Sequence, residues 1–332
     1  MSPGPVATAW LLPQLRGLQV DDPLSPVTVV VPSHHAGLHL RRTLAAQGYA
    51  GVRFMVLSEL AEALGASRLA SEGRAPLTAV TRDALVREGL RAGDRPLAES
   101  AGQAGLVDRV SALSVELRRR DDLAVDTGRI LGGGTATSRA AIRAIGEYER
   151  RRLKAGLYDE VDLLGSAVTA LDDGAVDGVL REHGAVVLHL PSRLDAPTAA
   201  LVRALARRTT VTIALTDVDA EDEAAAARLG VDPPVTSAGE AIPPATASVV
   251  IASDPIAEAR DAVRGALAAL EGDESVPLHR IAIVYRDEET YGTALRDTLR
   301  ASGVTPAILG GRPLLDSVAA RSLLGLIRLR DQ

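Results

Sequence analysis

The sequence predicts an α/β fold whose mainly parallel sheet is interrupted by a long helical insert. Residues 27–31 (VTVVV) form a continuous β-branched run, which is typical of a strand buried on both faces of a parallel sheet. Strand signals are absent from residues 76–172, where apolar residues recur at helical spacing. They return at 185–190 and 211–215, separated by a predicted helix at 196–207, which is the spacing of a βαβ unit.

The elements around the first strand follow from local signals. A helix is expected from about Ala36 to Gln47, and a second strand at residues 52–57. Ser58 is expected to cap a helix that runs through Leu64, since Glu62 stands close to capping-box spacing.

The chain divides into four predicted segments. Residues 1–75 begin the first α/β domain, 76–172 form the insert, and 173–244 complete the domain and add a linker. Residues 245–332 begin a second α/β domain. Its predicted strands are 247–251, 280–285 and 305–309, and its predicted helices are 255–270, 290–301 and 316–329. Three strands make a thin domain, so we expect an N-terminal piece of a longer protein. Within the insert, Gly132–Gly134 is expected to be a loop.

The composition excludes several classes of protein. The 332 residues contain no cysteine, which excludes disulfides, thiolate zinc sites and cysteine nucleophiles. Aromatic residues make up 2%, too few for a base-stacking platform of the OB or RRM type. The sequence shows neither a signal peptide nor an apolar run of membrane-spanning length, and we expect a cytoplasmic protein.

Phosphate binding would have to come from local basic clusters, because the net charge is -6. Three arginine clusters are candidates, at 41–42, 118–120 and 150–152, and each could equally be a solvated helix face. Lys154 is the only lysine, so any chemistry that requires a lysine has a single candidate.

Three segments, taken in order and spacing, resemble superfamily 1A helicases, specifically the AddB-type subunits of helicase–exonucleases that process DNA double-strand breaks. Residues 21–38 are similar to the motif Ia region, where a strand end and the following helix touch single-stranded DNA. Residues 148–164 resemble the segment that leaves the helical insert and ends in D-x-x-D-L-L. Residues 280–304 are similar to motif IV at the start of the second motor domain.

The resemblance implies a P-loop NTPase-like (RecA-like) first domain and a role in DNA repair and recombination. It assigns DNA contacts to Ser33, His34, His35 and Arg41, and it implies a motor partner of the AddA/RecB type. It also implies a nuclease domain of the PD-(D/E)xK type, which would lie downstream of Gln332, since the carboxylates near Lys154 are not borne on strands.

The chain departs from that family in its nucleotide site. The stretch equivalent to the P-loop keeps Gly4 and Thr8 but has no lysine, and a phosphate-binding loop needs one. The strand ending at residues 188–192 carries no carboxylate for Mg²⁺, and Asp195 is expected to be a helix N-cap. Arg286 stands where active relatives place an arginine that faces the nucleotide. We therefore expect no ATPase activity and no cofactor in this chain, with ATP and magnesium bound only by a partner subunit.

Other residues allow alternative interpretations. His35 and His39 have the spacing of metal ligands on a helix, but the sequence offers no third ligand, and no metal is expected. Asp159 and Asp162 could serve acid–base chemistry, although helix capping explains them better, and His189 is expected to be a core histidine. Two other functions stay open: a two-domain nucleotide-sugar transferase with a site near Ser33, Ser192 and Arg286, or a scaffold that binds only protein.

Overall fold

The computed structural model describes most of the chain and divides it into two compact units. The described residues are 4–95, 97–120, 123–191, 194–215, 227–230, 248–271, 276–307 and 317–330. The first unit is Met1–Ile242 and the second is Pro243–Gln332, so their boundary falls at the end of the predicted linker. Each unit is described by itself.

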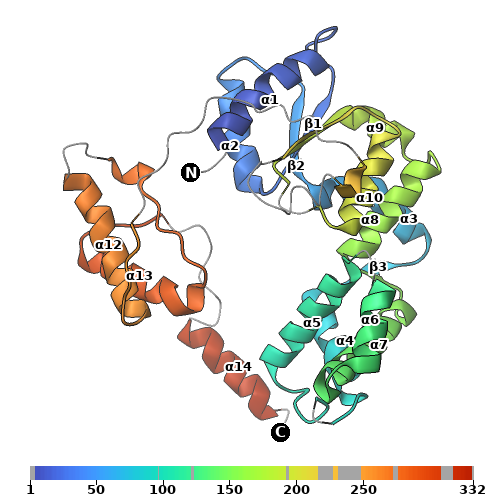
Figure 1. Ribbon diagram of the computed structural model, residues 1–332, viewed down its shortest axis with the longest axis vertical. Helices are drawn as coiled ribbons and strands as arrows, with labels where there is room; N and C mark the ends of the chain where they lie inside the picture. Colours follow the sequence, from blue (N-terminus) through green and yellow to red (C-terminus); the bar gives the residue numbers. More distant parts are fainter. Residues whose placement is uncertain are drawn as a thin grey trace. The chain divides into compact units, whose positions relative to one another are not determined.

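The first unit is built on a four-stranded parallel sheet with the order β2-β1-β5-β6. The strands are β1 (Val27–Val31), β2 (Val52–Val56), β5 (Ala185–His189) and β6 (Val211–Ala214). All five residues of β1 are buried, as its uninterrupted β-branched sequence predicts. The α/β class with a parallel sheet is thereby confirmed (Figure 1).

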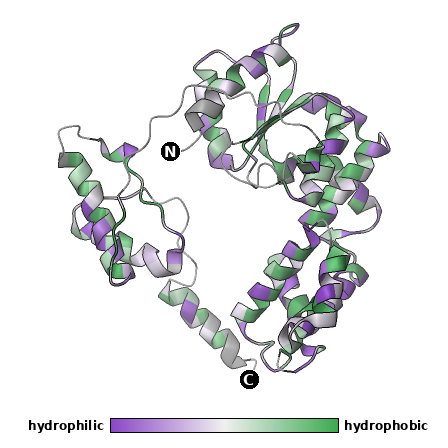
Figure 2. Ribbon diagram, in the orientation of Figure 1, coloured by the Kyte–Doolittle hydropathy of each residue, from purple (hydrophilic) through white to green (hydrophobic). Residues whose placement is uncertain are grey.

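Helices cover both faces of this sheet. In β1, Val27, Val29 and Val31 pack with the helices α1 (Gly4–Leu18) and α2 (His34–Ala45), whereas Val30 faces the opposite layer. That layer contains α3 (Leu57–Ser71), α8 (Glu160–Asp172), α9 (Asp177–His183) and α10 (Ala196–Ala206). The strands are mostly coloured as hydrophobic in Figure 2, as expected for a sheet that is covered by helices on both faces.

The helical insert forms a separate core. It contains α4 (Ala79–Arg91), α5 (Ala104–Arg118), α6 (Leu123–Gly133) and α7 (Ala136–Lys154). The chain enters and leaves the insert through a short parallel pair, β3 (Ala75–Pro76) and β4 (Leu157–Tyr158).

The predicted end of the insert at residue 172 is too late. Helix α8 packs against α3 in the sheet layer, where a Cβ on Gly65 would lie only 2.8 Å from the backbone nitrogen of Ala167. A side chain at position 65 would therefore force the two helices apart. The insert ends with α7, and α8 belongs to the sheet domain.

Three local expectations also need correction. Ser58 does not cap α3, because the helix begins one residue earlier and Glu59 Oε2 accepts a hydrogen bond from the Val56 backbone at 3.0 Å. Gly132 and Gly133 are the last residues of α6 rather than a loop. Helices α1 and α9 were not predicted from the sequence; the residues of α1 had been matched to the phosphate-binding loop of the helicase family.

The second unit is organised around two packed helices. Helix α12 (Pro255–Glu271) and helix α13 (Thr293–Ala301) share a small core of Ala259, Val263 and Leu295, and α14 (Val318–Arg330) is the last helix described.

The predicted strands of this unit are wrong for the described residues. No strand is formed within 248–251, 280–285 or 304–307, and the rest of the third strand lies outside the described part. Ile283 and Tyr285 pack against the core of α12 and α13. In contrast, Val249, Ile251 and Val284 are 92%, 94% and 92% exposed. The sequence of these segments has the alternation of a strand. Among the described residues, however, the segments have no hydrogen-bonded neighbouring strand, and no second layer covers their exposed side. Within the described helices of the chain, none is long and apolar enough to cross a membrane.

The buried His183 predicts a pH dependence of stability. Its side chain is 5% exposed, and its Nδ1 lies 3.3 Å from Thr28 Oγ1 and 3.4 Å from Arg53 Nη1. Burial, aided by the charge of Arg53, lowers the pKa of His183 below its usual value. The unfolded chain therefore binds a proton near pH 6.5 that the folded chain resists. The stability contribution is complete above that pH and is lost as the pH falls, with a slope of at most about 1.4 kcal/mol per pH unit.

The check is urea unfolding of the wild type and of His183→Gln between pH 8 and pH 5. The wild-type free energy of unfolding is expected to fall below about pH 6.5, and the variant, which has no imidazole at this position, is expected to show a flatter profile. Parallel profiles would assign the pH dependence to other groups.

Candidate nucleic-acid interface

Two of the three arginine clusters are neutralised by carboxylates where the insert meets the sheet domain. Arg118 Nη2 donates to Asp162 Oδ1 at 2.6 Å, and the same guanidinium also contacts Asp159. Arg152 has a side chain only 1% exposed, donates to Glu149 Oε2 at 2.8 Å and contacts Asp162. We call this group the ionic junction; its members are Arg74, Arg118, Arg152, Glu149, Asp159 and Asp162.

The junction explains why Asp162 stays charged although it is largely buried. Burial opposes its ionisation, but the hydrogen bond from Arg152 and the charge of Arg118 outweigh that effect and lower the pKa of the carboxyl. Asp159 caps α8 by accepting from the backbone of Val161 and Asp162, so the capping interpretation is confirmed. The two aspartates also hold the insert on the sheet layer.

The remaining arginines of these two clusters are paired as well. Arg119 donates to Asp195 at 2.8 Å and to Glu160 at 2.5 Å, and Asp195 caps α10 as predicted. The other partners are Asp126 for Arg120, Glu147 for Arg150, and Glu147 with Glu88 for Arg151. Arg118, Arg119 and Arg152 are therefore neither a solvated face nor a phosphate site, which corrects both alternatives for them.

Helix α2 differs, because its basic side chains are exposed and have no acidic partner among the described residues. Its sequence, HHAGLHLRRTLA, contains no carboxylate. Arg41 and Arg42 are exposed, and neither is ion-paired within the described part of the chain. His34, His35 and His39 are exposed on the same helix, whose residues Gly37, Leu40 and Leu44 are buried. We call these five exposed residues and Ser33 the α2 face.

The start of α2 lies at the carboxyl end of β1. Ser33 caps the helix, and its Oγ accepts a hydrogen bond from the Ala36 backbone at 3.2 Å. Gly37 allows the helix to lie close to the strand, since a Cβ there would be 3.2 Å from Val31 Cγ2. The structure thus brings the four residues assigned to DNA contact, Ser33, His34, His35 and Arg41, onto one exposed helix. Arg42 and His39, outside that assignment, join them.

The distribution of charge along the chain supports the same region. Residues 1–58, which supply α1, α2, β1 and β2, contain four arginines and two aspartates, a net charge of +2. Because the whole chain has a net charge of -6, the remaining residues together carry a net charge of -8. The residues that supply this layer are therefore net basic, whereas the rest of the chain is net acidic.

A crevice lies at the carboxyl edge of the sheet but offers an anion little. The chain leaves β1 toward β2 and leaves β5 toward β6, so the strand order reverses between β1 and β5, where α/β proteins commonly bind ligands. The cavity there measures about 180 Å³. Its one arginine, Arg119, is already bound by Glu160 and Asp195. Leu190, just after β5, has a φ of 51°, a strained left-handed conformation for a side-chain-bearing residue.

The other candidate residues lie on separate elements of the chain. Gly4 and Thr8 lie in α1, a helix rather than a phosphate-cradling loop, whereas exposed Arg286 belongs to the second unit. Ser192 lies outside the described residues. His35 and His39 are exposed on α2, and the described residues contain no group of three or more metal-binding side chains. His189 is buried at the end of β5, and Lys154 ends α7.

A scan against protein-family models finds no match to this chain, and a search of curated proteins finds no significantly similar sequence.

From the ionic junction we predict that Asp162 contributes strongly to the free energy of unfolding. Replacement by asparagine would leave Arg152 buried with one carboxylate fewer, which is expected to lower the free energy of unfolding by about 3 kcal/mol. The matched control is Asp173→Asn, because Asp173 pairs with Arg68 at 2.8 Å but is 55% exposed, and a loss of at most about 1 kcal/mol is expected there. Urea unfolding at pH 7 measures both, and equal losses would contradict the special role of the junction.

Proposed function

We propose that this chain is a helicase-like, non-catalytic region of a complex that processes DNA double-strand breaks. In this proposal it holds single-stranded DNA on the α2 face and supports a partner motor subunit of the AddA/RecB type. The complex would act in the cytoplasm. The P-loop NTPase-like character of the first domain is part of the same proposal, supported by the parallel sheet and the large helical insert.

The observation that carries the proposal is the basic surface of α2, which has no ion-pair partner in the part of the chain that the structure describes. Among the three arginine clusters, only Arg41 and Arg42 keep their charge available, and they lie on a helix that begins at a strand end. Arginine side chains contact phosphate oxygens, and such contacts position a strand without reading its sequence. With few aromatic residues to stack on bases, binding is expected to depend on the backbone and to weaken with salt.

The proposal assigns ATP hydrolysis to the partner. The only lysine, Lys154, ends α7 in the insert, and Gly4 and Thr8 lie in a helix. A phosphate-binding loop requires successive backbone N–H groups around the phosphates and a lysine beside them. This chain is expected to show no DNA-stimulated ATPase activity; such activity in the purified protein would overturn the proposal.

Binding of a labelled single-stranded oligonucleotide tests the role of the α2 face. The double substitution Arg41→Ala with Arg42→Ala is expected to weaken binding about tenfold at low salt and to reduce the slope of log K against log salt by about 1.4, since two phosphate contacts are lost. Fluorescence anisotropy over a range of salt concentrations provides both quantities.

The matched control removes two arginines elsewhere. Arg207 and Arg208 are adjacent, partly exposed and paired with Asp172 and Asp177, so Arg207→Ala with Arg208→Ala changes the net charge by the same amount. This control is expected to bind the oligonucleotide like the wild type. Equal weakening in both variants would reduce the effect to net charge. No binding by the wild type, with a motor subunit still associating, would support a protein-only scaffold instead.

A further inference from the structure

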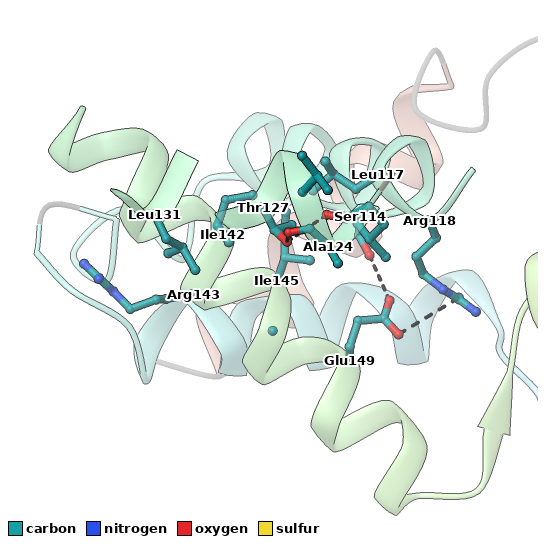
Figure 3. A pocket seen from close by; sticks show the side chains of 13 residues that line it. Ser114, Leu117, Arg118, Ala124, Thr127, Leu131, Ile142, Arg143, Ile145 and Glu149 are labelled. Atoms are coloured by element: carbon teal, nitrogen blue, oxygen red, sulfur yellow. Dashed lines mark hydrogen bonds and ion pairs between the residues drawn. The ribbon is translucent and has the colours of Figure 1, made fainter. Parts of the chain in front are cut away.

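A cavity lies within the insert, in a groove between α5, α6 and α7 (Figure 3). Its volume is about 850 Å³, within the range of small-molecule sites. Most of its lining is apolar and comes from Leu117, Leu123, Ala124, Val125, Leu131, Ile142 and Ile145. We call this cavity the insert groove.

Helix α6 forms one wall of the groove, and its Ile130 packs against the insert core while remaining partly exposed. None of its residues is buried, and Leu123, Val125 and Leu131 are 36%, 68% and 41% exposed. On the opposite wall Gly146 contributes no side chain, and a Cβ built there would have no neighbour within 4 Å. The groove is therefore open space lined by apolar side chains whose burial the fold itself does not complete.

One end of the groove is polar and rich in hydrogen-bond acceptors. Ser114 Oγ donates to Glu149 Oε1 at 2.9 Å (Figure 3). Arg152 donates to Glu149 Oε2. Ser114 Oγ and Glu149 Oε1 each keep a lone pair. The guanidinium of Arg118 lines this end too but donates to Asp159 and Asp162. A ligand would thus meet acceptors, while the nearby arginines disfavour a second cation.

We propose that the insert groove binds a small, mainly apolar molecule that carries one neutral N–H or O–H donor. The apolar body would cover the exposed side chains of α6, and the donor would reach Ser114 and Glu149. The proposal is independent of DNA binding, because the α2 face and the insert groove share no residue.

The probe is N-phenyl-1-naphthylamine, a neutral fused-ring compound with a single N–H donor whose fluorescence rises in an apolar site. It would be titrated into the full chain and into two glycine variants. Gly146→Leu places a side chain in the groove and is expected to weaken binding by at least about tenfold. Gly128→Leu is the matched control, because Gly128 lies on α6 with open space around it but does not line the groove, and unchanged binding is expected.

The donor is tested with 1-phenylnaphthalene, which lacks the N–H group and is expected to bind about fivefold more weakly. Equal affinity of the two compounds would overturn the assignment of the polar end. Absence of a fluorescence rise, or an equal rise in the wild type and Gly146→Leu, would overturn the site, because the dye would then lie on exposed apolar residues elsewhere.

Thermal unfolding followed by circular dichroism checks that Gly146→Leu is folded. If it is not, Ala124→Trp fills the groove from the exposed side of α6 and is expected to give the same loss of dye binding. The dye is also expected to raise the unfolding temperature of the wild type but not that of the filled variant. Oligonucleotide binding by the same variants is expected to stay unchanged, which separates failure of this site from failure of the α2 face.

Discussion

The buried guanidinium of Arg152 is the constraint on which the arrangement of the first unit depends. The Arg152 side chain is only 1% exposed, and a buried charge is stable only when groups of opposite charge are paired with it. Glu149 and Asp162 provide these partners. Asp162 belongs to α8, which packs in the sheet layer, and Glu149 belongs to α7 of the insert. Satisfying one buried cation therefore fixes the insert on the sheet domain.

This constraint also determines where the chain can bind an anion. Carboxylates from the insert and from the N-terminal ends of α8 and α10 form ion pairs with the arginines at 118, 119 and 152. The arginine that lines the crevice between β1 and β5, Arg119, is therefore already neutralised. Of the three arginine clusters, the pair Arg41 and Arg42 on α2, in the opposite layer, has no ion-pair partner among the described residues. The net charge of -6 is compatible with a basic α2 face, because helix α2 itself contains no carboxylate.

Features set by neighbouring residues could be predicted from the sequence, whereas those set by distant partners could not. The burial of β1 and the caps made by Asp159 and Asp195 follow from short patterns. The ionic junction joins Arg74 to Asp162 across 88 positions, and no local pattern reveals that pair. The α2 residues could be proposed from the resemblance to the helicase family. Only the structure shows that the arginines at 118, 119 and 152 are paired with carboxylates, whereas Arg41 and Arg42 have no such partner among the described residues. The strands of the second unit failed because alternation predicts an extended backbone but not a hydrogen-bonded neighbour for it.

The C-terminal end of α5 connects the features that the fold places apart. Arg118 enters the ionic junction and lines the insert groove, while Arg119 enters the wall of the crevice at the sheet edge. The backbone carbonyl of Arg119 also accepts from Ala196 at the start of α10. Because Arg118 ends α5 and Arg119 is its C-cap, a displacement of α5 would disturb the junction and the crevice together. A ligand that orders α6 against α5 would therefore stabilise the seat of the insert on the sheet, even though it contacts no residue of the sheet itself.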